Sequence, residues 1–161
     1  MKRLCLAIAA IGIATLPTAA QTYAANDAYR VCAPAATNAG IEAARATCGT
    51  VSAPDFSSLY ISSESQLKTF EATRDGFRQQ VKNYGQCVTQ LINSYRRPGA
   101  PADSPVPDQA ACAHSWAEDQ ATQLVRSFGK ACIEYSNRSM MSPELPPYDG
   151  ACYPSAGNAR G

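Results

Sequence analysis

The sequence contains few of the residues from which catalytic, metal and cofactor sites are usually built. It has one histidine in 161 residues, so a site that needs a histidine base or ligand would have to use His114. Ser115 is only its neighbour on a predicted helix, while Glu118 at i+4 could hydrogen-bond the ring. A zinc site would lack ligands, and the acidic residues do not have calcium-loop spacing. We therefore predict no catalytic, metal or cofactor site, with a hydrolase that uses His114 as an alternative.

Further absences exclude other classes of protein. There is no Cys-x-x-Cys pair, which excludes a thioredoxin-type redox motif, a zinc-ribbon half-site and a covalent c-type haem site. A glycine-rich phosphate loop is also absent. Neither sign of charge dominates, because 14 basic and 13 acidic residues give a net charge of +1 without a basic cluster. Such a chain attracts nucleic acid and anionic lipid only weakly, so we predict neither as a partner.

Residues 1–20 have the form of a signal peptide. Lys2 and Arg3 provide a basic start, residues 4–16 are apolar, and residues 18–20 are small residues at a predicted cleavage site. The apolar run is too short to span a bilayer, and we predict no membrane span in the mature chain. The short basic start and alanine-rich core look bacterial. The predicted location is therefore the periplasm or the outside of the cell.

Residues 63–137 are predicted to form an antiparallel helical hairpin, which makes the fold class all-α. In the first arm apolar residues recur in steps of three and four, which places them on one helix face with Arg74 in the only polar position. This arm begins at Ser63, which forms a capping box with Gln66, and it ends before Pro98. The apolar positions are Leu67, Phe70, Phe77, Val81, Tyr84, Val88, Leu91 and Tyr95.

A proline-rich breaker run over residues 97–107 separates the two arms. Ser104 or Asp108 can cap the second arm, whose apolar face is smaller and would allow a close approach of the helices. The second arm is predicted to end near Asn137, because the residue before Pro143 disfavours helical backbone. Its apolar face consists of Ala110, Ala113, Ala117, Ala121, Leu124, Phe128, Ala131 and Tyr135.

Less regular segments flank the hairpin. Residues 21–62 are predicted to hold a short helix near residues 35–47 and an extended connector over residues 49–61. Residues 138–161 read as an irregular tail with proline and glycine, tethered by Cys152. Two helices alone leave half of each apolar face uncovered. Either the N-terminal segment folds back over the hairpin, or two hairpins associate as a four-helix bundle, and the sequence leaves both open.

Loss of Cys5 with the signal peptide leaves six cysteines, which predicts three disulfides in an oxidising compartment. Cys112 and Cys132 are 20 residues apart on one predicted helix, about 30 Å by helical rise, so they cannot pair. Cys87 and Cys112 lie at similar heights in the two arms. We therefore prefer a Cys87–Cys112 disulfide, which would join the arms near the turn.

Under that preference, Cys132 pairs with Cys32, Cys48 or Cys152, which leaves three arrangements. The combination of Cys32–Cys48 with Cys132–Cys152 keeps both loops local in sequence. We favour this combination among the three.

Five aromatic residues on the two arms are candidates for a binding site. Together they could form an interaction face of the hairpin, and four of them, all except Phe77, could line a cleft between the arms. We predict a non-catalytic interaction or assembly module of the cell envelope, which pairs as a homodimer or binds an envelope protein. A carrier of a small apolar ligand in an aromatic cleft is the alternative. The five residues are Phe77, Tyr84, Tyr95, Trp116 and Phe128.

A Tyr-Gly-Gln-Cys step from Tyr84 to Cys87 lies late in the first long helix, after Cys48 and a connector with Pro54. This layout resembles small exported proteins of alphaproteobacteria that have a Tyr-x-x-Cys step in a helical hairpin. The resemblance covers residues 48–135 and implies an exported helical hairpin, without implying an activity. The last three cysteines of the chain depart from that pattern.

Overall fold

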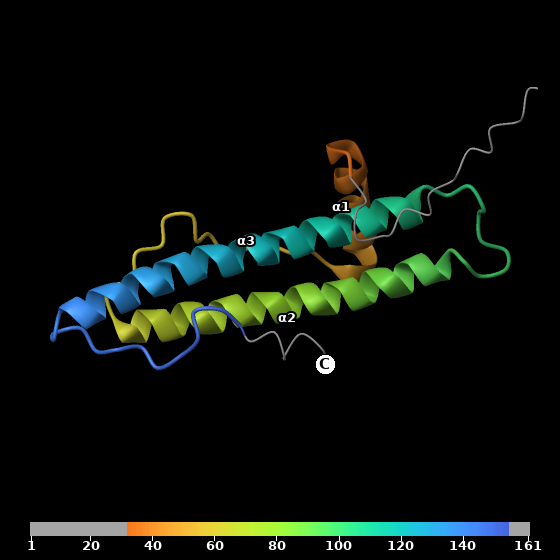
Figure 1. Ribbon diagram of the computed structural model, residues 1–161. Helices are drawn as coiled ribbons and strands as arrows, with labels where there is room; N and C mark the ends of the chain where they lie inside the picture. Colours follow the sequence, from red (N-terminus) through yellow and green to blue (C-terminus); the bar gives the residue numbers. More distant parts are fainter. Residues whose placement is uncertain (1–31, 155–161) are drawn as a thin grey trace, which may run out of the picture. The chain divides into compact units, whose positions relative to one another are not determined.

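A computed structural model describes residues 32–154, and the predicted signal peptide lies outside this range. The described chain forms three helices, α1 (Pro34–Cys48), α2 (Glu64–Ser94) and α3 (Val106–Met141). α2 and α3 run antiparallel, and α1 crosses them near the end where a loop joins them (Figure 1). The described residues contain no strand. The predicted all-α fold with a helical hairpin and a short preceding helix is therefore confirmed.

α2 begins one residue after its predicted cap. The Ser63 hydroxyl accepts a hydrogen bond from the Gln66 amide at 3.2 Å. The Gln66 side chain accepts from the amide of Ser62 at 2.9 Å, instead of from that of Ser63 as a capping box would have it. The predicted pair, Ser63 and Gln66, thus accepts hydrogen bonds from backbone amides at the helix start. The Gln66 side chain binds the amide one position earlier than predicted.

α3 continues to Met141, which is beyond the predicted end near Asn137. Arg138 holds this last stretch, because its guanidinium donates to the Tyr60 hydroxyl at 2.7 Å and to the Ile61 carbonyl. The helix ends where Ser142, the residue before a proline, adopts extended backbone. Pro143 ends the helix, as predicted. The contacts of Arg138 with Tyr60 and Ile61 stabilise the last turn, so the helix extends to Met141 instead of ending near Asn137.

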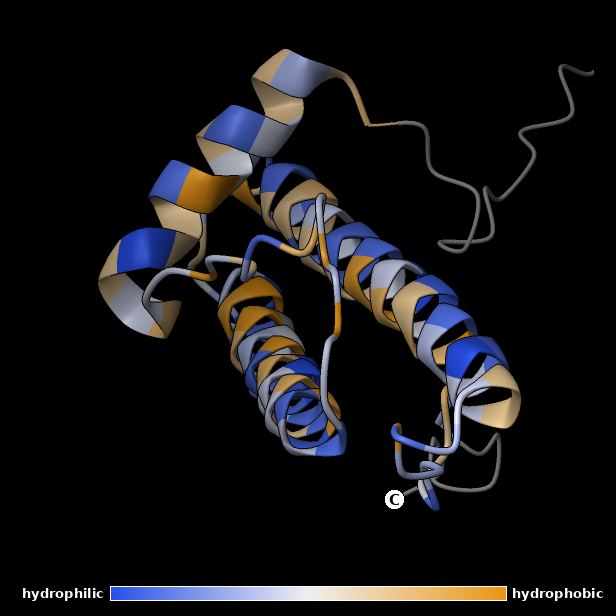
Figure 2. Cartoon of the chain, turned by 90° about the vertical axis from the view of Figure 1, so that its left-hand side faces the viewer, coloured by the Kyte–Doolittle hydropathy of each residue, from blue (hydrophilic) through white to orange (hydrophobic). Residues whose placement is uncertain are grey.

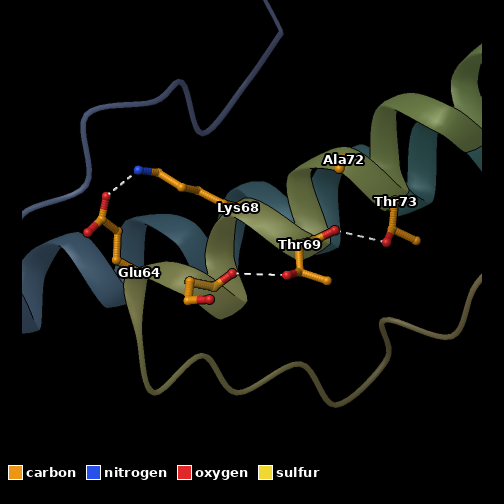
Figure 3. A pocket seen from close by; sticks show the side chains of 6 residues that line it. Glu64, Lys68, Thr69, Ala72 and Thr73 are labelled. Carbon is orange, nitrogen blue, oxygen red and sulfur yellow. Dashed lines mark hydrogen bonds and ion pairs between the residues drawn. The ribbon is translucent and has the colours of Figure 1, made fainter.

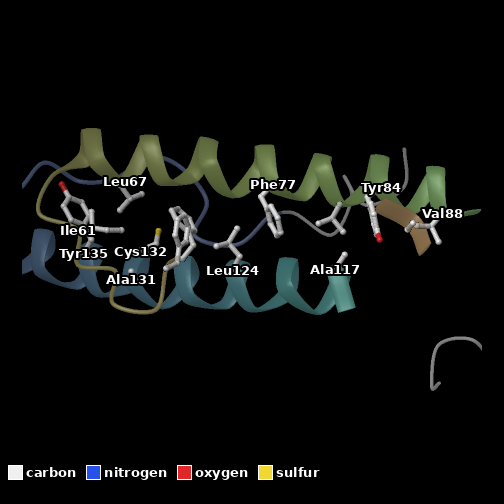
Figure 4. Close-up of a cluster of buried hydrophobic side chains, with 14 of the residues drawn as sticks. Ile61, Leu67, Phe77, Tyr84, Val88, Ala117, Leu124, Ala131, Cys132 and Tyr135 are labelled. Carbon is white, nitrogen blue, oxygen red and sulfur yellow. The ribbon is translucent and has the colours of Figure 1, made fainter. Parts of the chain in front are cut away.

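The core lies between α2 and α3 (Figure 4). The predicted apolar positions Leu67, Phe77 and Val88 of α2 are all buried and point toward α3. Opposite them, α3 contributes small side chains, with Ala113 and Ala117 completely buried, as the alanine-rich pattern predicts. The outer faces of both long helices are largely hydrophilic (Figure 2).

The N-terminal segment folds back over the hairpin, which is the first of the two arrangements that the sequence left open. Ala44 of α1 is completely buried, and the connector buries Phe56 and Ile61. The Phe56 ring packs edge-on against Phe70 of α2 with ring centroids 5.3 Å apart. α1 also lies very close to α3 at Gly40, where a Cβ atom would stand 1.8 Å from the Gln109 carbonyl oxygen. Only glycine fits this backbone-to-backbone contact.

Three disulfides join these elements, and their pairing corrects the prediction. Cys48 pairs with Cys87, with Cα atoms 5.6 Å apart, so the preferred Cys87–Cys112 bridge is wrong. Cys112 pairs instead with Cys32. Matching heights on two arms do not fix the direction around each helix axis, and both hairpin cysteines pair with residues at the ends of α1.

The favoured combination was half correct. Cys132 pairs with Cys152, as predicted, with Cα atoms 5.4 Å apart. Cys32–Cys48 is wrong, because the two cysteines flank α1 and are separated by about 22 Å of helix, which is far beyond the reach of a disulfide. Two disulfides therefore attach α1 to the hairpin, and the third attaches the tail.

The close contact at Gly40 can be tested by adding one methyl group. We expect Gly40→Ala to lower the free energy of unfolding by about 2 kcal/mol, because the Cβ meets backbone that cannot rotate away. The control is Gly76→Ala in α2, where nothing lies within 4 Å of the added Cβ. The control should gain about 0.5–1 kcal/mol from helix propensity. Urea unfolding of the oxidised proteins measures both, and equal stability of the two variants would contradict this packing.

Candidate functional site

The five predicted aromatic residues do not form a common surface. Phe77, Tyr84 and Phe128 are 4%, 6% and 0% exposed, so the predicted interaction face is wrong for these three. Tyr95 and Trp116 are half-buried. Aromatic residues at core spacing face the partner helix, and here the second arm and the connector of the same chain already cover them.

A polar groove between α2 and α3 contains the histidine. The groove has a volume of about 890 Å³, and its lining includes Asp75, Arg78, Lys82, His114 and Glu118. It carries charges of both signs and no aromatic ring except the imidazole. This lining differs from the apolar aromatic cleft that an apolar ligand would need.

His114 is held in this groove by a glycine and a carboxylate. A Cβ atom at Gly85 would stand 2.2 Å from the imidazole Nε2, so the ring lies directly against the backbone of α2. The same nitrogen is 3.4 Å from the Glu118 carboxylate, at the predicted i+4 position. The nearby Thr89 hydroxyl donates to the Gly85 carbonyl at 2.8 Å, so it is oriented toward the helix backbone. The arrangement accounts for His114 as a side chain packed against α2 and in contact with Glu118.

A second hollow lies on the outer face of α2 near its start (Figure 3). Lys68 pairs with Glu64 at 2.6 Å in this region. The hydroxyls of Thr69 and Thr73 donate to backbone carbonyls one turn earlier, at 3.0 and 2.9 Å. Its polar groups are thus already paired within the helix, and the hollow offers no converging set of groups for a ligand.

Residues 32–154 contain no group of three or more histidine, cysteine or acidic side chains placed to hold a metal ion. All six cysteines in this range are in disulfides. Within the same range, no helix combines the length and the apolar character that crossing a bilayer requires.

Arg74 is the main polar feature of the core. Its side chain is 2% exposed, and the guanidinium carbon lies 4.4 Å from the centre of the Phe128 ring. The guanidinium donates to both carboxylate oxygens of Asp75, at 2.8 and 3.0 Å, and to Glu71 at 3.4 Å. The pattern identified Arg74 as the polar position of the apolar face, but only the tertiary structure shows what surrounds it.

The remaining donor group of Arg74 reaches the C-terminal tail. Its Nη1 donates to the carbonyls of Ala151 and Cys152 at 3.4 and 3.5 Å. These residues are 77 and 78 positions away along the chain. One buried guanidinium thus connects α2, the Phe128 ring of α3 and the tail.

Several apolar side chains on and near the last turns of α3 are exposed. Met140 and Met141 are 79% and 87% exposed, and Ile133, two turns earlier on α3, is 45% exposed. Tyr60 of the connector is 65% exposed, and the Arg138 guanidinium stacks 4.6 Å from its ring centre. The helical pattern did not predict these exposed side chains, because it singled out the aromatic residues of the inward faces.

No protein-family model matches the chain, and neither a curated protein nor a solved structure matches it. The resemblance to exported alphaproteobacterial proteins therefore stays a prediction.

The Arg74–Asp75 pair predicts a pH dependence of stability. The hydrogen bonds from Arg74 lower the pKa of Asp75 from its usual 3.8. A lowered folded-state pKa adds stability above pH 3.8, and this stability is lost as the pH falls through the lowered pKa. We expect Asp75→Asn to cost about 0.5 kcal/mol at pH 7, since the carboxylate is half-exposed, and close to nothing near pH 2.

Urea unfolding at pH 7 and near pH 2 measures this difference. Asp119→Asn, which removes an exposed carboxylate from α3, is the matched control and should change stability little at either pH. A cost for Asp75→Asn that is the same at both values of pH would contradict the ion-pair interpretation.

Proposed function

We propose that the chain is an exported, non-catalytic interaction module of the cell envelope that associates with a second copy of itself. The observation that carries the proposal is the exposure of apolar side chains near the end of α3, where Met140 and Met141 are 79% and 87% exposed. Three disulfides support folding in an oxidising compartment, in agreement with the predicted signal peptide, which lies outside the described residues. A rigid, crosslinked scaffold that exposes a limited apolar area is suited to binding.

The exposed residues form a stripe along α3, which we call the α3 stripe and define as Arg126, Lys130, Ile133, Asn137 and Met140. Their spacing of three and four residues places them on one helix face. The buried residues of α3, such as Phe128 and Tyr135, lie on the other side, toward α2. The stripe is basic at its start and apolar at its end.

Charge complementarity favours a second copy as the occupant of the α3 stripe. Two α3 helices that pair antiparallel, centred between Ile133 and Asn137, would place Arg126 of one copy just beyond the end of α3 of the other, where the turn after Ser142 carries Glu144. The Met140 side chain would then meet the aliphatic part of Lys130 from the second copy. The same contacts form twice around a twofold axis, as a self-complementary interface requires.

The size of the stripe indicates a reversible dimer. From Arg126 to Met140 it extends about 21 Å at the rise of a helix, and it is one helix wide. A contact of this size lies at the small end of the range of specific interfaces. The dimer should therefore depend on protein concentration.

The other functions expected from the sequence have less support. An apolar-ligand carrier needs an aromatic cleft, but Tyr84 and Phe128 are buried among the side chains of the chain's own helices. A hydrolase that uses His114 needs an oriented nucleophile, whereas the imidazole is engaged with Glu118. No contact in the described residues favours either function over the interaction module.

The dimer can be tested by placing charge on the α3 stripe. We expect the wild-type mature protein to shift from monomer to dimer as its concentration rises, and the double variant Ile133→Asp, Met140→Asp to stay monomeric. The two carboxylates would have to be desolvated in the interface, which opposes association. Light scattering coupled to size exclusion measures the mass, and circular dichroism checks the helical fold.

Charge exchange makes the test specific to the antiparallel arrangement. Arg126→Glu should weaken the dimer, and adding Glu144→Arg should restore it, because the pair is then reversed. Ala72→Asp places a carboxylate on the outer face of α2 and serves as the control that keeps wild-type association. A wild-type protein that stays monomeric at all concentrations would overturn the second copy as the partner.

A further inference from the structure

The C-terminal tail, residues 142–154, returns along the hairpin and is held to it at successive points (Figure 1). The Tyr135 hydroxyl donates to the Pro146 carbonyl at 2.8 Å. Further along, the Asp149 carboxylate lies 3.8 Å from the Lys68 ammonium. Arg74 then donates hydrogen bonds to the carbonyls of Ala151 and Cys152. We call this segment the strap.

The end of the strap is seated in a notch of α3. Cys152 is bonded to Cys132, which is completely buried, and Tyr153 lies against Gly129. A Cβ atom at Gly129 would stand 2.3 Å from the Tyr153 ring, so the ring fits here only because residue 129 has no side chain. The strap thus covers Cys132 and the edge of the Arg74 guanidinium.

The polar contacts that hold the end of the strap, after Tyr148, are weak. The two hydrogen bonds from Arg74 to the strap are long, at 3.4 and 3.5 Å, and the Lys68–Asp149 pair joins two exposed groups. Exposed ion pairs of this kind contribute little. Leu145 and Tyr148 pack against the core, but without the disulfide few contacts would oppose the release of the end of the strap, after Tyr148.

The other two disulfides are placed differently. They attach both ends of α1, and α1 stays packed on α3 at Gly40 and through the buried Ala44. Reduced thiols at those positions would therefore remain close together, which favours their reoxidation. The thiols of the strap would separate once it moves. Among the three disulfides, Cys132–Cys152 should be the one most readily reduced in the native protein.

We propose that residues 142–154 form a redox-dependent strap, which Cys132–Cys152 closes over the Arg74 and Cys132 region of the hairpin and which a dithiol reductant opens. The helical hairpin and α1 keep their arrangement in the open state, because Cys32–Cys112 and Cys48–Cys87 remain intact. This proposal does not rest on the proposed dimer, although the strap ends at Gly129, which is three residues from Arg126 and four from Ile133 of the α3 stripe.

The opening step is a two-electron thiol–disulfide exchange. A thiolate of the reductant attacks the Sγ atom of Cys152, which is half-buried, whereas Cys132 is completely buried. This forms a mixed disulfide with Cys152 and releases the Cys132 thiolate, which takes up a proton. The second thiol of the reductant then displaces Cys152 as a thiol. The protein gains two electrons and two protons, and the dithiol becomes a disulfide.

The first experiment is a titration of the oxidised mature protein with dithiothreitol, followed by alkylation and peptide mapping by mass spectrometry. We expect a species with two labels, both on Cys132 and Cys152, to accumulate while the helical circular dichroism is unchanged. The proposal would be overturned if another pair of cysteines were labelled first, or if the helical circular dichroism were lost in the same step.

The second experiment uses Cys152→Ser, which leaves Cys132 as a single free thiol. If the disulfide is what closes the strap, iodoacetamide should label Cys132 within about tenfold of its rate in the urea-unfolded chain. Labelling more than about a hundredfold slower would show that the strap stays closed without the bond, which would overturn the proposal. If labelling of Cys152→Ser is slow, adding Gly129→Ala, which displaces Tyr153, should make it fast. Adding Gly76→Ala to Cys152→Ser should leave the labelling rate unchanged whether that rate is fast or slow.

Discussion

The apolar contact between α2 and α3 is the interaction on which the rest of the structure depends. Large side chains of α2, such as Leu67 and Phe77, pack onto a face of α3 that is rich in alanine. Burial of this apolar surface is the main source of stability that two long helices can offer. It also sets the relative rotation of the two helices, which then decides where every cysteine and every polar residue of the hairpin points.

The third element completes this contact without a second chain. α1 and the connector cover the hairpin, and Gly40 allows the backbone of α1 to approach that of α3. Two disulfides then attach the ends of α1, which closes long loops and restricts the unfolded chain. The tail is attached separately, by one disulfide and by the buried Arg74, so the described chain consists of a crosslinked three-helix unit and a strap.

The sequence predicted the helices well and the site poorly, for one physical reason. Helical periodicity is local, so Leu67 and Val88 could be assigned to the inner face, and Ser63 to the start of α2, from neighbouring residues alone. Phe77 and Phe128 follow the same period, and for that reason they are core residues instead of the predicted interaction face. The exposed methionines at the end of α3 gave no periodic signal of their own.

By itself, the sequence determined that the chain is all-helical, that a proline-rich run separates two long arms and that Arg74 occupies an apolar face. Only the tertiary structure decided that Cys48 pairs with Cys87 and that Arg74 meets the tail. Hydrogen bonds within a helix and the hydrophobic pattern depend on residues a few positions apart. A disulfide depends on the position and direction of two side chains far apart in the chain, which the packing of all elements fixes together.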